Sequence, residues 1–97
     1  MAKYSNVVKC IVKDGAQNTI IEKFNNVPKW EGVRRTILIQ TGEKAFCSIG
    51  IWEDENSMVK SRQNMLAFLD TLRPMLEEIS PEHGATDPVS GAIVAEV

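Results

Sequence analysis

The stretch "AFCSIGIWEDENSMVKS", residues 45–61, joins two kinds of local structure at an acidic centre. Its first half places apolar residues in alternation up to Trp52, which is typical of a strand. Its second half takes the three- and four-residue apolar spacing of an amphipathic helix that continues past Arg62. Asp54 lies between the two, and its carboxylate suits the N-cap because it accepts from the free amides of a first helical turn. The segment therefore predicts a strand that passes directly into a long helix.

The residues before this junction predict two further strands and a helix. Residues 7–13, "VVKCIVK", alternate and are rich in β-branched side chains, so we expect a strand there. Apolar residues recur at helical spacing over residues 16–26, and Pro28 ends that helix. Residues 32–42, bounded by glycines, predict a second strand. This strand should form a hairpin with the third strand, at residues 44–53.

The residues after the junction predict an interrupted helix, a loop and a last strand. The apolar stripe runs from Met58 to Ile79, but Pro74 removes a backbone hydrogen bond within it. We expect a kink or break near Arg73, followed by a further short helix. Residues 80–91 have the Gly, Pro and Asp density of a surface loop, and "AIVAEV", residues 92–97, should be the final strand.

The order strand, helix, strand, strand, helix, strand indicates an α+β fold of the ferredoxin-like β-α-β-β-α-β type. Right-handed crossovers place both helices on one face of a four-stranded antiparallel sheet. At 97 residues the chain has room for one hydrophobic core, so we expect a single domain over residues 1–97.

The sheet face without helices is expected to be covered by a second copy of the chain. Each predicted strand carries apolar residues on both of its sides, as Val8 and Cys10 do against Val7 and Ile11. A sheet with one solvated face would alternate more cleanly, and a large exposed apolar patch usually marks an association surface. We therefore predict a homodimer packed sheet against sheet about a two-fold axis.

Composition excludes several classes of function. A net charge of −2 leaves no basic face for nucleic acid. No apolar run approaches the roughly 20 residues of a membrane-spanning helix, and the N-terminus lacks the apolar core of a signal peptide, so we expect a cytoplasmic protein. Cys10 and Cys47 fall in apolar strands without a metal-ligand spacing, so we interpret them as inert core thiols and expect no metal site.

The motifs "FNNVPKWEGV" after the first helix, "IGIWEDENS" at the junction and "VSGAIVAEV" at the end resemble the antibiotic biosynthesis monooxygenase family of dimeric α/β barrel proteins. The resemblance covers nearly the whole chain, and its most specific part is the strand that ends in Trp52 and Glu53. It implies a cavity between the sheet and the helices of each subunit. Some members use this cavity to oxidise polycyclic aromatic substrates with oxygen and without metal or flavin, so no cofactor is expected.

Other members of the family degrade haem, with an Asn on the first strand and a Trp and a His on the second long helix. Asn6 matches the Asn, but residues 55–79 contain neither His nor Trp. The only histidine is His83, in the loop that follows, where a solvent-exposed side chain is expected. We therefore do not expect haem degradation.

Three residues are the candidates for binding a small aromatic substrate, whereas no catalytic residue can be assigned. Trp52 would stack on an aromatic ligand, or it seals the end of the core and orients the helix. Asn6 and Arg62 would orient a substrate oxygen; alternatively, Asn6 satisfies local backbone and Arg62 lies on the surface with its charge in water. Trp30 is expected to cover the end of the first helix. Two functions stay open, an oxygenase and a non-catalytic ligand-binding or dimeric interaction protein of the same fold.

Overall fold

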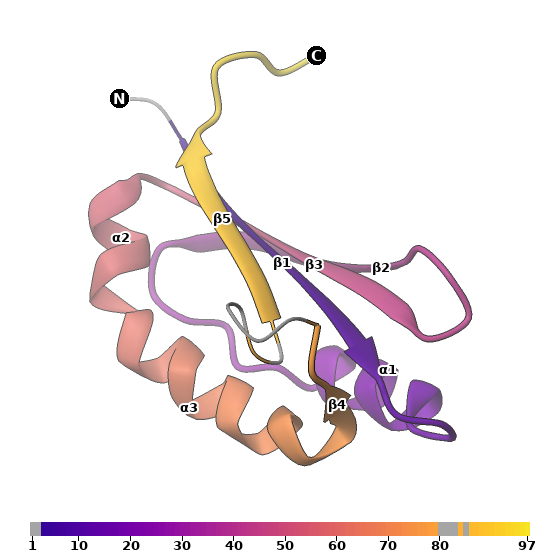
Figure 1. The fold of residues 1–97 in the computed structure, drawn as a ribbon. Coiled ribbons are helices and arrows are strands. Elements are labelled where there is room, and N and C mark those ends of the chain that lie inside the picture. The colour runs from indigo at the N-terminus through magenta and orange to yellow at the C-terminus, as the bar shows by residue number, and fades with distance from the viewer. Residues whose placement is uncertain (1–2, 80–83, 85) are drawn as a thin grey trace.

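The computed structural model describes residues 3–79, 84 and 86–97. The chain begins with a strand and a helix and continues into a hairpin (Figure 1). Two consecutive helices and a 3-10 turn follow before the chain returns to the sheet. The elements are β1 (Tyr4–Val12), α1 (Gln17–Asn25), β2 (Val33–Gln40), β3 (Ala45–Trp52), α2 (Glu55–Lys60), α3 (Arg62–Leu72), η1 (Arg73–Met75), β4 (Leu76–Glu77) and β5 (Thr86–Ala92).

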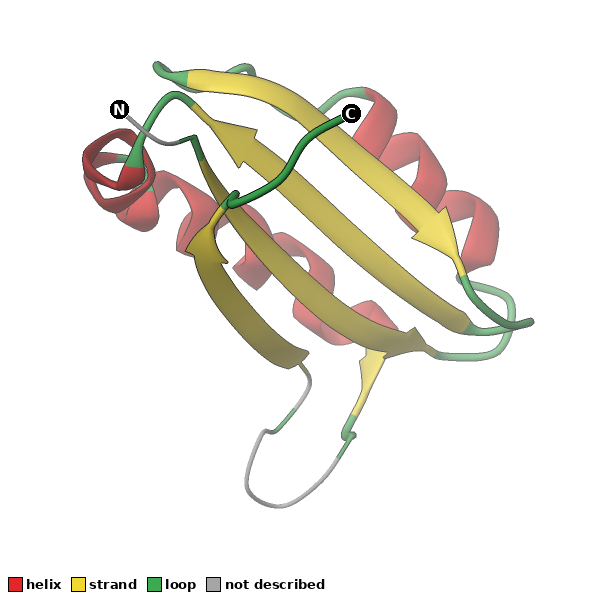
Figure 2. Ribbon diagram, turned by 90° about the horizontal axis from the view of Figure 1, so that it is seen from above, coloured by secondary structure: helices red, strands yellow, loops and turns green. Residues whose placement is uncertain are grey.

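The sheet is antiparallel throughout and has the strand order β2, β3, β1, with β4 and β5 both pairing with the far edge of β1. β5 pairs with the Tyr4–Cys10 part of β1, and the short β4 with Ile11 and Val12. These two strands therefore occupy one position in the sheet, the fourth. All helices lie on one face, behind the strands in Figure 2. The α+β ferredoxin-like fold predicted from the sequence is confirmed.

The helix after the junction differs from the prediction in two places. It is divided at Ser61, whose amide donates to the carbonyls of both Ser57 (3.2 Å) and Met58 (3.1 Å), so the turn tightens there before α3 begins. α3 ends at Leu72, next to the expected break, but the chain then forms only the three-residue η1, which contains Pro74, and enters β4; the expected second short helix is therefore wrong. Leu76 explains this outcome, because it pairs with Val12 of β1 and buries its side chain in the core.

The last strand is also displaced from its predicted place. β5 covers Thr86–Ala92, most of which looked like a loop, whereas residues 93–97 lie beyond the sheet. β1 begins at Tyr4, opposite Ala92, so no partner strand remains for the residues that follow. Pro88 is tolerated because β5 is an edge strand, where a missing amide hydrogen need not break a ladder.

The junction itself has the predicted geometry. The Asp54 carboxylate accepts a hydrogen bond from the Ser57 amide at 2.8 Å and caps α2. This backbone hydrogen bond lowers the pKa of Asp54 below its ordinary value, because it favours the charged carboxylate. Trp52, the last residue of β3, packs with Val33 and Met58 directly before the cap. The strand end and the helix start are therefore joined by both packing and capping.

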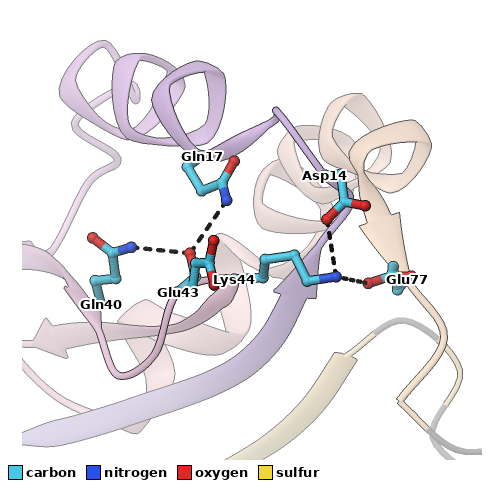
Figure 3. A network of polar contacts seen from close by, with 6 residues as sticks. All are labelled: Asp14, Gln17, Gln40, Glu43, Lys44 and Glu77. Carbon is cyan, nitrogen blue, oxygen red and sulfur yellow. Dashed lines mark hydrogen bonds and ion pairs between the residues drawn. The ribbon is translucent and has the colours of Figure 1, made fainter.

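The turn between β2 and β3 is tied to its neighbours by polar contacts (Figure 3). Lys44 pairs with Asp14 at 3.1 Å and with Glu77 at 3.5 Å, and the Gln17 side chain donates to the carbonyl of Glu43 at 3.3 Å. The hydrogen bond to Asp14, together with the two carboxylate charges, raises the pKa of Lys44. These exposed contacts connect the turn with α1 and β4, although surface ion pairs contribute little to stability.

The sheet face opposite the helices, hereafter the open face, is largely apolar. The pairing places Val7, Ile49 and Ile37 side by side across three strands, with Val89 next to Val7 on β5. Ile39 is 41% exposed and Val89 is 61% exposed.

None of the helices in the described ranges has the length and apolar character needed to cross a membrane.

Candidate functional site

A cavity of about 440 Å³ lies between the sheet and the helices. Its sheet side is formed mainly by residues of β1, β3 and β5, with one residue each from β2 and β4, and its helix side by α3 with contributions from α1 and the α1–β2 loop. Most of the lining is apolar. Clefts of this size that carry a few polar groups among apolar ones are typical of small-molecule sites.

The floor of the cavity contains a polar pair from the two central strands. The indole N–H of Trp52 donates to the side-chain oxygen of Asn6 at 2.7 Å. That bond fixes the amide of Asn6, whose nitrogen contacts only the Met65 sulfur, at 4.0 Å, among the described residues. A thioether is a weak acceptor, so the Asn6 N–H group remains free to donate to a ligand oxygen.

Gly50 makes room for this pair. It lies opposite Asn6 in the register of β1 and β3. A side chain there would collide with the Asn6 oxygen and stand 3.0 Å from the Trp52 nitrogen. The absence of a side chain at this position therefore permits the hydrogen bond across the strands.

Aromatic rings continue from the floor along one wall. Trp30 stacks on Trp52 with a centroid distance of 6.4 Å and an interplanar angle of 8°. Phe68 of α3 lies edge-on to Trp30 at 6.1 Å, and Phe24 of α1 lies edge-on to Phe68 at 5.3 Å. Such offset and edge-on arrangements are favourable for aromatic rings, and they present an apolar wall to a planar ligand.

Exposed lining residues mark the mouth of the cavity, and most of them belong to α3 and β5. Arg62, Leu66 and Arg73 lie along one face of α3 and its C-terminal end, opposite Pro88 of β5. A second hollow of about 310 Å³ lies between α1 and β2, and Phe24 lines both spaces.

The three substrate-binding residues predicted from the sequence all line this one cavity. Asn6 and Trp52 meet at its floor, and Arg62 lies at its mouth. Trp52 also seals the core, because it is only 1% exposed. Trp30 was expected to cover a helix end, but it stacks on Trp52. His83 falls outside the described residues.

Phe68 and Gly50 were not predicted from the sequence as part of the site. Phe68 lies among the apolar residues of α3, and this pattern indicates burial but not contact with a cavity. The role of Gly50 depends on the register that sets it opposite Asn6, and this register is not determined by the residues of either strand alone. Within the described ranges, no group of His, Cys, Asp or Glu is arranged to hold a metal ion.

Cys10 lines the cavity as a neutral thiol. Burial, followed by the neighbouring Cys47, raises its pKa to about 11 from 9.0. At pH 8 its thiolate fraction is thus about a hundredfold lower than that of an ordinary cysteine, and only the thiolate is a nucleophile.

We expect folded protein to react with a thiol reagent at least about a hundredfold more slowly than urea-unfolded protein at pH 8. Stopped-flow absorbance with an aromatic disulfide, using Cys47→Ser to isolate Cys10, measures this; equal rates would contradict it.

No protein-family profile and no curated protein sequence matches the chain. Several solved structures, however, are similar to this chain over nearly its whole length. A variant of SnoaB, a cofactor-independent oxygenase from Streptomyces nogalater, has a TM-score of 0.74 at 10% identity, over 100% of this chain and 98% of the other. A protein from Chloroflexus aurantiacus, provisionally assigned as an antibiotic biosynthesis monooxygenase, has a TM-score of 0.72 at 14% identity, over 99% of this chain and 97% of the other.

The chain has the fold of antibiotic biosynthesis monooxygenase-like proteins. A dimeric ferredoxin-like protein from an uncultured marine organism is also similar, with a TM-score of 0.71 at 8% identity, over 100% of this chain and 92% of the other. At these identities the likeness concerns the fold alone. It confirms the fold that the resemblance in the sequence implied.

Proposed function

We propose that the protein is a cytoplasmic homodimer of the antibiotic biosynthesis monooxygenase type that oxidises a small aromatic compound with molecular oxygen and without a cofactor. The observation that carries this proposal is the free amide N–H of Asn6, held by Trp52 at the floor of an apolar cavity of about 440 Å³. The solved oxygenase of the same fold supports the reaction class.

An aromatic substrate with a methylene group across the same ring from a ketone, as in an anthrone, can supply the electrons for such a reaction. Loss of a proton from the methylene carbon gives an anion whose charge resides largely on the ketone oxygen. In the overall reaction this carbon loses both hydrogens and gains one oxygen atom of molecular oxygen as a new carbonyl, while the other oxygen atom leaves with the two hydrogens as water. No external reductant is therefore required. The Asn6 N–H would donate to the ketone oxygen and stabilise the charge that develops there, and the aromatic wall would hold the rings and exclude water.

Oxygen consumption tests this function with a panel of anthrones and quinols. We expect wild-type protein to turn over at least one of them, and Asn6→Ala to lower kcat/KM by about a hundredfold, because a lost donor to a developing oxyanion costs this much. Ser5→Ala, on the same strand but on the open face, is the matched control and should leave kcat/KM unchanged. If no compound in the panel is consumed, the oxygenase proposal fails.

The alternative is a non-catalytic ligand-binding or dimeric interaction protein with the same cavity. The lack of an assigned general base among the described lining residues favours it. Saturable binding of a panel compound without oxygen uptake would support this alternative.

The homodimer is proposed from the open face. The apolar row of Val7, Ile49 and Ile37 lies at its centre, and a partner copy can bury this row about a two-fold axis. Light scattering at micromolar concentration is expected to give about twice the chain mass of 10.8 kDa. Ile49→Lys should give the single-chain mass, whereas Val59→Lys, at an exposed apolar position of α2, should not. A monomeric wild-type protein would refute the dimer.

A further inference from the structure

The charges around the cavity have one sign. Two arginines, Arg62 and Arg73, line it, and the described lining residues include no carboxylate. Arg73 is already paired, because its Nε contacts the Asp70 carboxylate at 2.8 Å. Arg62 has no ion pair and no side-chain hydrogen bond to any described residue. One guanidinium at the mouth is therefore left without a charge partner within the described part of the chain.

Arg62 lies at the same end of the cavity as the polar pair on the floor. It precedes Met65 by one helical turn, and the Met65 sulfur contacts the Asn6 amide. Leu66 and Leu69 follow Arg62 on the cavity-facing side of α3. A ligand that contacts Arg62 at the mouth can thus place its rings against the leucines and the tryptophan stack.

We propose that the cavity selects apolar aromatic anions, with a carboxylate or sulfonate group at Arg62 and the ring system inside. This inference rests on the proposed function, namely that the cavity binds an aromatic compound, and it adds the charge of that compound. A guanidinium and a carboxylate or sulfonate form charge-assisted hydrogen bonds, which are about twice as strong as neutral ones. The net charge of the chain is −2, so the field of the whole protein does not attract anions and any preference must arise locally.

A pair of dyes tests the charge preference. The probes are 1-anilinonaphthalene-8-sulfonate and N-phenyl-1-naphthylamine, which share their rings and differ by the sulfonate, and whose fluorescence rises in apolar surroundings. We expect wild-type protein to bind the sulfonate at least about tenfold more tightly than the neutral amine at low salt. This ratio should fall at high salt, because part of the attraction is between exposed charges.

Substitutions test whether Arg62 causes the preference for the sulfonate dye. Arg62→Gln should weaken sulfonate binding about tenfold and leave amine binding within about twofold, and Arg62→Lys should restore part of the loss. Arg35→Gln is the matched control, since it removes the same charge from an exposed position of β2 outside the cavity lining, and should change neither constant by more than about twofold. Ser48→Phe, which projects a ring from β3 into the cavity, should abolish binding of both dyes while the circular dichroism spectrum stays that of the folded chain.

The possible results distinguish the preference for anions from the proposed function on which it rests. If both dyes bind equally well and Arg62→Gln changes neither, the anion preference is wrong while the cavity remains a binding site. If neither dye binds, or if both still bind to Ser48→Phe, the cavity is not the binding site, and both the inference and the proposed function are overturned.

Discussion

Replacing Trp52 with alanine is expected to lower the free energy of unfolding by about 3–5 kcal/mol, the usual cost of emptying a buried tryptophan position. Trp52 is among the largest fully buried side chains, and it packs against Val33 and Met58 where β3 meets α2. The substitution also removes the donor that satisfies the Asn6 oxygen. Domains of this size are stable by about 5–15 kcal/mol in total, so the variant should be close to unfolding. Urea denaturation followed by far-UV circular dichroism measures the change.

The matched control is Trp30→Ala, which removes the same atoms from the other half of the stack. Trp30 is only partly buried and lies in the α1–β2 loop. We expect a loss of about 1–2 kcal/mol, because less apolar surface is returned to water. Equal losses for the two variants would show that Trp52 does not seal the core, and would contradict this account of the junction.

Gly50→Ala is the second substitution with a large expected effect, about 2–3 kcal/mol of destabilisation from one added methyl group. The new carbon would collide with the Asn6 oxygen and crowd the Trp52 nitrogen, which stands 3.0 Å from its position. Both neighbours are held by strands, so relief requires either a rotated Asn6 side chain or a widened sheet. Urea denaturation gives the energy, and the indole N–H resonance of Trp52 should move as its hydrogen bond is lost.

Gly91→Ala provides the control for Gly50→Ala. Gly91 also lies in a strand, and a methyl group there would meet no atom within 4 Å. We expect a change within about 0.5 kcal/mol, as for surface substitutions in general. If Gly50→Ala were equally mild, the Asn6–Trp52 hydrogen bond could not depend on the space that Gly50 leaves.

Local signals along the chain were sufficient for most of the fold. Asp54 caps α2 as its position before an apolar helix indicated, and the hairpin forms between residues 32–42 and 44–53 as predicted. The last strand was misplaced because "AIVAEV" has the stronger strand composition, whereas pairing with β1 decides the outcome. Pro88 is accommodated in β5 because an edge strand tolerates a residue without an amide hydrogen. Tertiary pairing therefore overrode local propensity at the end of the chain.

The site was predictable only in part. Trp52, Asn6 and Arg62 were singled out one by one, and the structure brings all three to the lining of one cavity. The hydrogen bond between Asn6 and Trp52 was not expected, since it depends on the register that sets Asn6 opposite Gly50. Register follows from pairing between distant strands and is weakly encoded in any short stretch.

The stack of Trp30 on Trp52 also makes the protein its own spectroscopic reporter. The chain contains 2 tryptophans, and both line the cavity. Intrinsic emission excited at wavelengths where only indole absorbs therefore originates entirely from this site, with no background from elsewhere in the chain. Two nearly parallel indoles 6.4 Å apart should also couple their electronic transitions and give a paired signal in the ultraviolet circular dichroism spectrum. A compound that enters the cavity can thus be followed without any label.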